Sequence, residues 1–173
     1  MVPNLEQIRE VASKDQFLNE IKVFLDNLAQ QDKSKALYVV KNLFFAPETH
    51  PRVRYMIADR LGRLGSRQLF QQLLSYFILR KFPDTLALIT ALRAFGDPEA
   101  VPALSEYYPN ATYRECMEIM EAIANSRSPE TMEFLSQIYN QQISYAQNFD
   151  ANEHEEIRQR ASALMGKSMM RFD

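Results

Sequence analysis

Tryptophan is missing from the chain of 173 residues, and cysteine and glycine are scarce, with only Cys116 and four glycines. A lone cysteine cannot form an internal disulfide, which fits a reducing compartment. Four glycines are too few for collagen, and they leave no glycine-rich loop to hold a nucleotide phosphate. The sequence also has no apolar run long enough to cross a bilayer, and acidic residues stand where a secretory signal needs basic ones. We therefore expect a cytoplasmic protein with no membrane partner.

Residues able to catalyse a reaction are equally few. Besides Cys116 the chain has only His50 and His154, and no G-x-S-x-G motif is present. The acidic run 153–156 surrounds His154, but adjacent residues of a helix point in different directions and cannot share one metal ion. An acidic first turn of a helix explains this run. We therefore expect no catalytic residue, metal, cofactor or small-molecule substrate.

What the chain does have is apolar residues, 46% of the total, arranged in a repeat of 31 residues. The blocks that begin at Gly65, Gly96 and Arg127 are spaced by this period. Three sets of apolar positions keep the same spacing: Ile57, Leu88 and Ile119; Leu61, Leu92 and Ile123; Leu73, Leu104 and Leu135. A fixed period of this length is typical of stacked helix pairs.

Each repeat unit contains signals for two helices. Apolar residues over 53–64 recur with helical spacing and end at Gly65, a suitable C-cap, whereas Asp97 and Ser128 precede proline and predict helix starts at the next two junctions. Residues 157–167 align with 53–63 at an offset of 104, which is 11 residues more than three periods of 31. We therefore expect about 11 extra residues, and we place them around 141–152.

The N-terminal part lies outside the clear repeats. We expect a helix over 34–45 that pairs with 51–65, and Ser13 as the start of a capping box that opens a helix through Gln30. The total is nine or ten helices, and no alternating Val/Ile/Thr-rich run predicts a strand. We expect one domain, in which residues 1–32 form N-terminal capping helices and residues 33–173 form the repeats.

The pairing of a helix like 53–65 with one like 96–109 resembles the short HEAT-like repeat of bacterial proteins, the type found in phycobilin lyase subunits. The resemblance covers roughly residues 34–170. It implies an all-α fold, a right-handed α-α superhelix of about four to five helix pairs, in which the second helix of each pair lines the concave face.

Charge is distributed unevenly along the chain. Residues 50–81 hold seven basic residues and one acid, a net charge of +6, whereas residues 97–156 hold twelve acids and two arginines, a net charge of −10. The seven basic residues are Arg52, Arg54, Arg60, Arg63, Arg67, Arg80 and Lys81. The guanidinium group of arginine can bind both oxygens of a carboxylate or phosphate at once, so we identify these residues as a candidate partner-binding site. The alternative is that several of them pair with acids of adjacent helices.

Tyr107 and Tyr108 add aromatic side chains to this candidate site. Because they are neighbours on a helix, at least one should face solvent, where a tyrosine can anchor a partner; packing between repeats is the alternative role.

These observations predict a non-enzymatic adaptor that binds an acidic segment or helix of a protein partner through a basic concave surface. Nucleic-acid binding is a disfavoured alternative, because the acidic half would repel a phosphate backbone. The resemblance alone suggests another alternative, a non-catalytic subunit of a lyase-like complex. Attraction between the +6 and −10 regions could also produce salt-sensitive self-association.

Overall fold

The computed structural model describes residues 3–171, and in this range every regular element is helical. The ten α-helices are α1 (Leu5–Ala12), α2 (Leu18–Gln31), α3 (Lys33–Phe45), α4 (Pro51–Leu64), α5 (Arg67–Leu79), α6 (Thr85–Phe95), α7 (Val101–Tyr107), α8 (Tyr113–Ser126), α9 (Thr131–Tyr139) and α10 (Ala151–Met170). Two short 3-10 turns, η1 (Pro98–Ala100) and η2 (Tyr108–Asn110), flank α7. Between Pro3 and Arg171 no helix combines the length and the apolar character needed to span a membrane.

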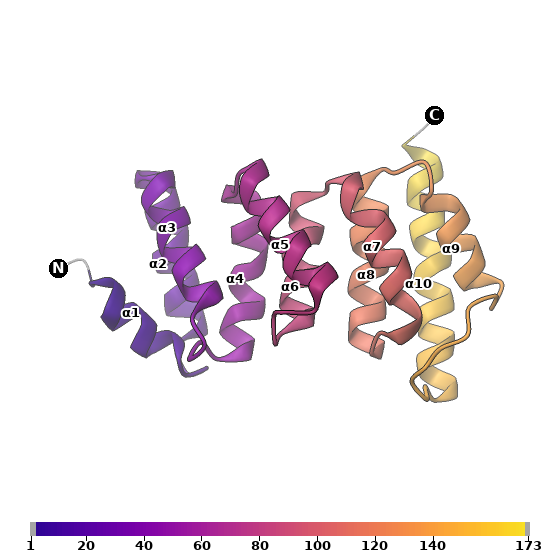
Figure 1. Cartoon of the computed structure of the whole chain (residues 1–173), viewed down its shortest axis with the longest axis horizontal. Helices are drawn as coiled ribbons and strands as arrows, with labels where there is room; N and C mark the ends of the chain where they lie inside the picture. The colour runs from indigo at the N-terminus through magenta and orange to yellow at the C-terminus, as the bar shows by residue number, and fades with distance from the viewer. Residues whose placement is uncertain (1–2, 172–173) are drawn as a thin grey trace.

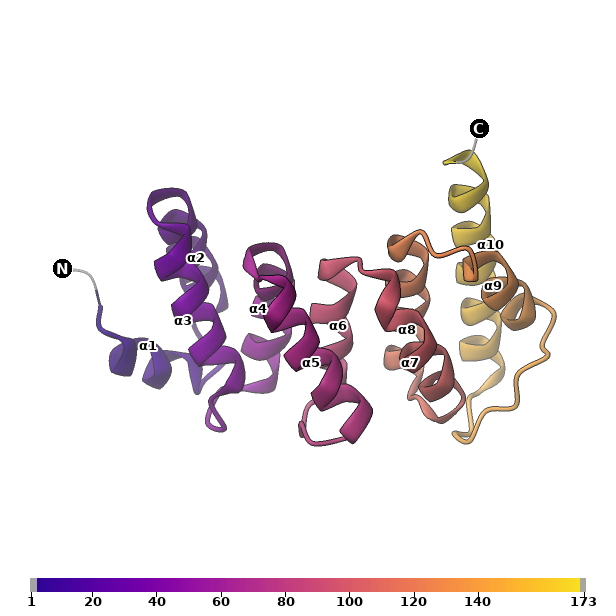
Figure 2. The same ribbon diagram turned by 45° about the horizontal axis from the view of Figure 1, so that its top comes forward.

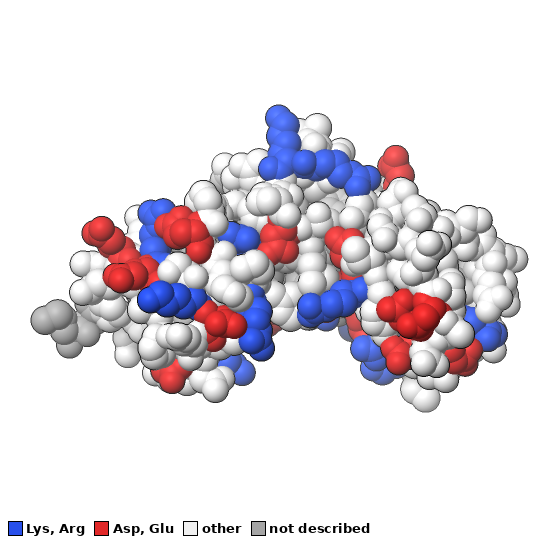
Figure 3. Space-filling model, turned by 90° about the horizontal axis from the view of Figure 1, so that it is seen from below, with Lys and Arg blue, Asp and Glu red and all other residues white. Residues whose placement is uncertain are grey.

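Helices α3 to α10 form antiparallel pairs, α3 with α4, α5 with α6, α7 with α8 and α9 with α10, which stack in chain order to give an α-solenoid (Figures 1 and 2). The first two helices, α1 and α2, precede them; α2 packs on α3, and the short α1 lies at an angle at the end of the stack. We call α4, α6, α8 and α10 the inner layer and α3, α5, α7 and α9 the outer layer. Successive inner helices pack tightly on one another, whereas successive outer helices touch far less. This difference curves the stack, and the space-filling view from below shows an arch that is hollowed on the side away from α5 and α7 (Figure 3).

The 31-residue period corresponds to the core of the solenoid. All nine of its apolar positions are buried, and the most exposed of them, Leu88 and Leu92, reach only 2%. Each pair therefore covers its apolar face with the neighbouring pairs, as expected for stacked repeats. The period predicted the fold class correctly.

Most helix starts have side-chain caps, because the first backbone N–H groups of a helix need acceptors. Thr112 and Asp150 form reciprocal capping boxes with Glu115 and Glu153. Asp97 does cap its junction, but the turn it opens is the 3-10 turn η1, and α7 begins only at Val101. Ser128 likewise accepts from the N–H of Glu130 within a turn, and α9 starts at Thr131.

One other local expectation needs correction. Ser13 opens no helix: it is the C-cap of α1, and its hydroxyl donates to the carbonyl of Glu10. The helix expected from Ser13 through Gln30 is α2, which starts only at Leu18. The extra residues of the last repeat fall where expected. They form the loop 140–150, which is fixed by a hydrogen bond from the N–H of Ala146 to the carbonyl of Pro109.

Candidate functional site

Arg54 does not face a partner surface, because its side chain is only 6% exposed. Nε donates to the carbonyl of Phe44 over 2.9 Å, one terminal nitrogen donates to the carbonyl of Ala46 over 2.8 Å, and the other lies 3.4 Å from a carboxylate oxygen of Asp84. The guanidinium thus holds the end of α3 and the start of α6 against α4. This internal role removes Arg54 from the expected binding set.

Arg60 also has an internal role. Its guanidinium binds both carboxylate oxygens of Asp26, over 2.9 Å and 3.1 Å, and so ties α4 to α2. The hydrogen bonds from Arg60 hold the pKa of the Asp26 carboxyl below its usual value. The alternative interpretation of the sequence, pairing with acids of adjacent helices, therefore describes both Arg54 and Arg60.

The other basic residues of the cluster lie apart from one another. Arg67 pairs with Asp97 and Glu99 of the next repeat, and Arg52 lies 3.2 Å from Asp15. Arg80 and Lys81 are exposed at the turn after α5, where Arg80 stacks over the ring of Tyr107. Proximity in sequence did not produce one basic surface, because the seven residues are distributed over two helices and their turns.

The two tyrosines pack between helices. Tyr108 is fully buried and its hydroxyl bonds to that of Tyr145, so it cannot anchor a partner. Tyr107 is half-buried and donates to the carboxylate of Glu115 at 3.0 Å. Burial and the Glu115 carboxylate raise the pKa of Tyr107 to about 12. Packing between repeats is the role that the structure gives to both side chains.

Arg63 is the member of the predicted set that lines a hollow together with basic residues from distant parts of the chain, and its side chain is exposed. A hollow of about 330 Å³ crosses the C-terminal halves of all four inner helices. Its lining includes Arg63 from α4, Arg93 from α6, Glu121 and Asn125 from α8, and Lys167 and Arg171 from the end of α10. We call this hollow the concave groove. It extends into a second hollow of about 580 Å³ between α2 and α4, which shares Asp59 and Arg63 and includes Lys22.

The concave groove keeps an excess of positive charge after internal pairing. Arg63 pairs with Asp59 over 2.7 Å on the same helix, and Glu121 is held by Arg160 over 2.7 Å. Within the part of the chain that the structure describes, Lys22 and Lys167 take part in no ion pair. The concave groove therefore has an unpaired cation in Lys167, and the adjoining hollow has one in Lys22.

Below the concave groove, the Glu118 carboxylate joins three inner helices. It accepts from the hydroxyl of Tyr55 on α4 over 2.8 Å and pairs with Arg93 on α6 over 3.0 Å. Burial, followed by the hydrogen bond to Glu118, raises the pKa of Tyr55. Because the carboxylate is largely enclosed and used by these two neighbours, it fixes the spacing of the repeats and offsets the charge of Arg93. Of the other cations in the groove, Arg63 pairs with Asp59, whereas Lys167 and Arg171 take part in no ion pair among the described residues.

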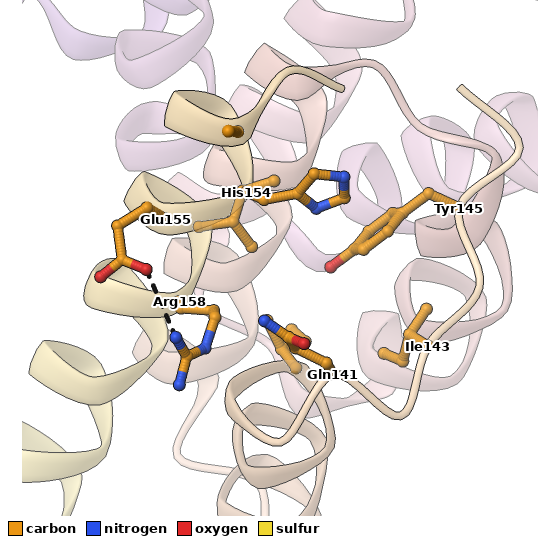
Figure 4. A pocket seen from close by; sticks show the side chains of 9 residues that line it. Gln141, Ile143, Tyr145, His154, Glu155 and Arg158 are labelled. Carbon is orange, nitrogen blue, oxygen red and sulfur yellow. Dashed lines mark hydrogen bonds and ion pairs between the residues drawn. The ribbon is translucent and has the colours of Figure 1, made fainter. Parts of the chain in front are cut away.

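A separate hollow of about 360 Å³ lies beneath the loop 140–150, where the regular period is interrupted. Figure 4 shows Tyr145 from the loop and His154 from α10 pointing toward one another across it, with the Glu155–Arg158 ion pair on another wall. Arg158 also donates to the carbonyl of Tyr139, so its guanidinium is already used. Among residues 3–171 no group of three or more His, Cys, Asp or Glu side chains is placed to bind a metal ion.

Cys116 lies on α8 and is fully buried against the 3-10 turn η2, with Sγ 3.9 Å from the carbonyl oxygen of Tyr108. Burial raises the pKa of the thiol to about 12, so almost no thiolate exists at neutral pH. We therefore expect the native protein to resist thiol reagents at about pH 8, and the guanidinium-unfolded chain to react at one thiol per chain. Reaction with a chromogenic disulfide measures this. Fast, complete labelling of the folded protein would contradict the burial of Cys116.

Comparison with known proteins finds a family model that matches a short part of the chain. Residues 86–108, which include all but the first residue of α6, together with η1 and α7, match the family model described as the PBS lyase HEAT-like repeat. The match contains the block 96–108, one of the segments that carried the resemblance in the sequence. No curated protein and no solved structure matches the chain.

Proposed function

We propose that this HEAT-like repeat protein is a non-enzymatic adaptor that holds an acidic segment of a protein partner in its concave groove. The observation that carries the proposal is the convergence of Arg63, Lys167 and Arg171 on one hollow, although 104 residues separate the first two in sequence. A solenoid offers an extended curved surface to another macromolecule, and exposed basic side chains on it attract carboxylates and speed the encounter.

An acidic helix or extended segment fits the groove better than a small molecule. The hollow is an open furrow across four helices, with several separated charged side chains. A ligand must be long to reach both Arg63 and Lys167, and it must be anionic to use them. Small-molecule sites, in contrast, are enclosed and mostly apolar, with few polar groups.

Reversing the groove charge tests the proposal. We expect the double variant Arg63→Glu/Lys167→Glu to bind an acidic probe at least about tenfold more weakly than wild type, because two attractive contacts become repulsive. The probe is a fluorescein-labelled, glutamate-rich helical peptide of about 20 residues, long enough to span a small domain. Fluorescence anisotropy at low and physiological salt gives the affinities.

The control variant, Lys41→Glu/Lys81→Glu, makes the same change in net charge at exposed positions of α3 and of the turn after α5, outside the groove. It should bind like wild type if the groove is the site. Equal loss in both double variants would show a nonspecific charge effect and overturn the proposal. A 20-base-pair duplex forms the second arm, and tighter binding of the duplex than of the peptide would favour a nucleic-acid partner instead.

The description of the matched repeat supplies a second candidate, a non-catalytic subunit of a lyase-like complex. In that role the same groove would hold an acidic segment of the catalytic subunit. The groove variants therefore apply to both candidates.

A further inference from the structure

The outer side of the first two helices is apolar, although the end of a helix stack is ordinarily polar. A hollow of about 650 Å³ runs between α1 and α2, and its lining includes Ile8, Val11, Phe17 and Phe24. Val11 is 37% exposed and Phe17 is 44% exposed. We call this hollow the α1–α2 groove. A groove between two helices with exposed apolar side chains is suited to receive a third helix.

At the opposite end of the stack, α10 has a face that is covered in the equivalent helix α4. At the offset of 104 residues, Ala58 and Gly62 of α4 correspond to Ser162 and Gly166 of α10. Ala58 and Gly62 are buried beneath α6, so closely that a Cβ on Gly62 would lie 2.3 Å from Cβ of Ala94. Ser162 and Gly166 are exposed, and a Cβ on Gly166 would meet nothing within 4 Å.

Two further observations show that this α10 face is suited to packing. A hollow of about 420 Å³ between the end of α9 and α10 has Gln159, Ser162 and Ala163 in its lining, beside the Glu155–Arg158 ion pair. On the same face, at the C-terminal end of α10, the side chains of Met169 and Met170 are 61% and 79% exposed. Flexible methionine side chains fill irregular contacts well. The face therefore combines a furrow, open space at Gly166 into which another helix can pack closely, and exposed methionines at its end.

We propose that the first two helices of a second copy of this chain stack on the α10 face, so that copies associate head to tail. The repeat itself points to the occupant: in α4 the equivalent positions are covered by α6, a helix of the next pair of this chain, and α1 and α2 present an uncovered apolar groove. The contact continues the stacking that already joins successive pairs within the chain. It goes beyond the proposed adaptor function, since neither face lines the concave groove.

A contact between two different faces does not close on itself, so it builds open chains whose length depends on concentration. Light scattering after gel filtration should therefore show a mass that rises from monomer as the wild-type concentration increases from about 10 μM to about 1 mM. The α1–α2 groove contributes apolar side chains, and the two charges in the lining of the α10 hollow, Glu155 and Arg158, pair with each other, so the association should persist at about 1 M salt. The charge attraction expected from the sequence would instead vanish there.

Two single variants block one face each. Phe17→Glu places a charge in the α1–α2 groove, and Gly166→Arg fills the α10 face at a position where the added side chain meets no neighbour in the monomer. Each variant alone should remain monomeric. Mixed together they should form a one-to-one dimer and nothing larger, because only the α10 face of the first and the α1–α2 groove of the second are intact.

The result that overturns the proposal is a wild-type mass independent of concentration, a homodimer of either single variant, or no dimer in the mixture. Gln72→Glu, an exposed change on the outer layer, is the control and should associate like wild type. Circular dichroism and the melting temperature of each variant establish that its fold is intact. A monomeric wild type would leave the α10 face to a helix of another protein, and the second-copy proposal would then be wrong.

Discussion

Arg54→Ala is expected to destabilise the protein by about 3–5 kcal/mol, although the residue belongs to a cluster that suggested a surface site. The substitution removes hydrogen bonds to the carbonyls of Phe44 and Ala46 and the partner of the Asp84 carboxylate. These acceptors lie where water has little access, since the Arg54 side chain is 6% exposed and that of Asp84 is 20% exposed. Buried polar groups without partners are costly, and the stacked ring of Phe82 also loses its cation.

Chemical denaturation followed by circular dichroism measures the free energy of unfolding of this variant. The neighbouring Arg52→Ala is the control: the Arg52 side chain is 69% exposed, so its ion pair with Asp15 should contribute less than about 1 kcal/mol. A loss below about 1 kcal/mol for Arg54→Ala would contradict the role given to this side chain. Charge reversal at Arg54 is therefore a test of folding, and binding experiments should leave the residue intact.

Alanine at Gly62 and at Gly166 should change stability in opposite directions. At Gly62 the new Cβ would lie 2.3 Å from Cβ of Ala94 and 2.8 Å from the carbonyl oxygen of Ala91, so α4 and α6 must move apart. At Gly166 the same Cβ meets nothing within 4 Å, and alanine should stabilise α10 by up to about 1 kcal/mol through its higher helix propensity.

Both positions are in helix interiors, so the propensity gain is similar and cancels in the comparison of the two variants. Denaturation gives the change in the free energy of unfolding for each variant. The difference between the two changes should then measure the cost of overpacking at Gly62 alone, which we expect to be about 1–3 kcal/mol or more. Equal stabilisation by both substitutions would show that α4 and α6 are not in close contact at Gly62. The same pair of variants also tests whether the α10 face is as open as the second-copy proposal requires.

Periodicity predicted the solenoid because burial imposes it directly. Positions such as Ile57 and Leu88 must be apolar in every repeat to cover the neighbouring pair, so the sequence records them. Helix starts were predicted less well: Asp97 and Ser128 cap turns that precede the α-helices, since a 3-10 turn and an α-helix accept the same cap. Ser13 carried a capping pattern, but it ends α1.

The candidate site was harder to predict, because charge along the sequence does not show which side of a helix a residue occupies. Arg54 follows directly on the core residue Val53, and that side of α4 is covered by the next repeat. Lys167 could have been found from its alignment with Arg63 at the offset of 104. Arg171 lies beyond the aligned segment and carries no comparable signal; only the three-dimensional stack brings it to the concave groove.

The unequal contacts of the two layers also determine how the protein can bend. Since the inner helices are tightly packed and the outer helices touch little, a change of curvature turns about the inner layer and alters mainly the gaps between outer helices. The spacing of the cations along the groove floor changes least in such a motion. A change of curvature would therefore leave the row of positive charges in the concave groove nearly unchanged.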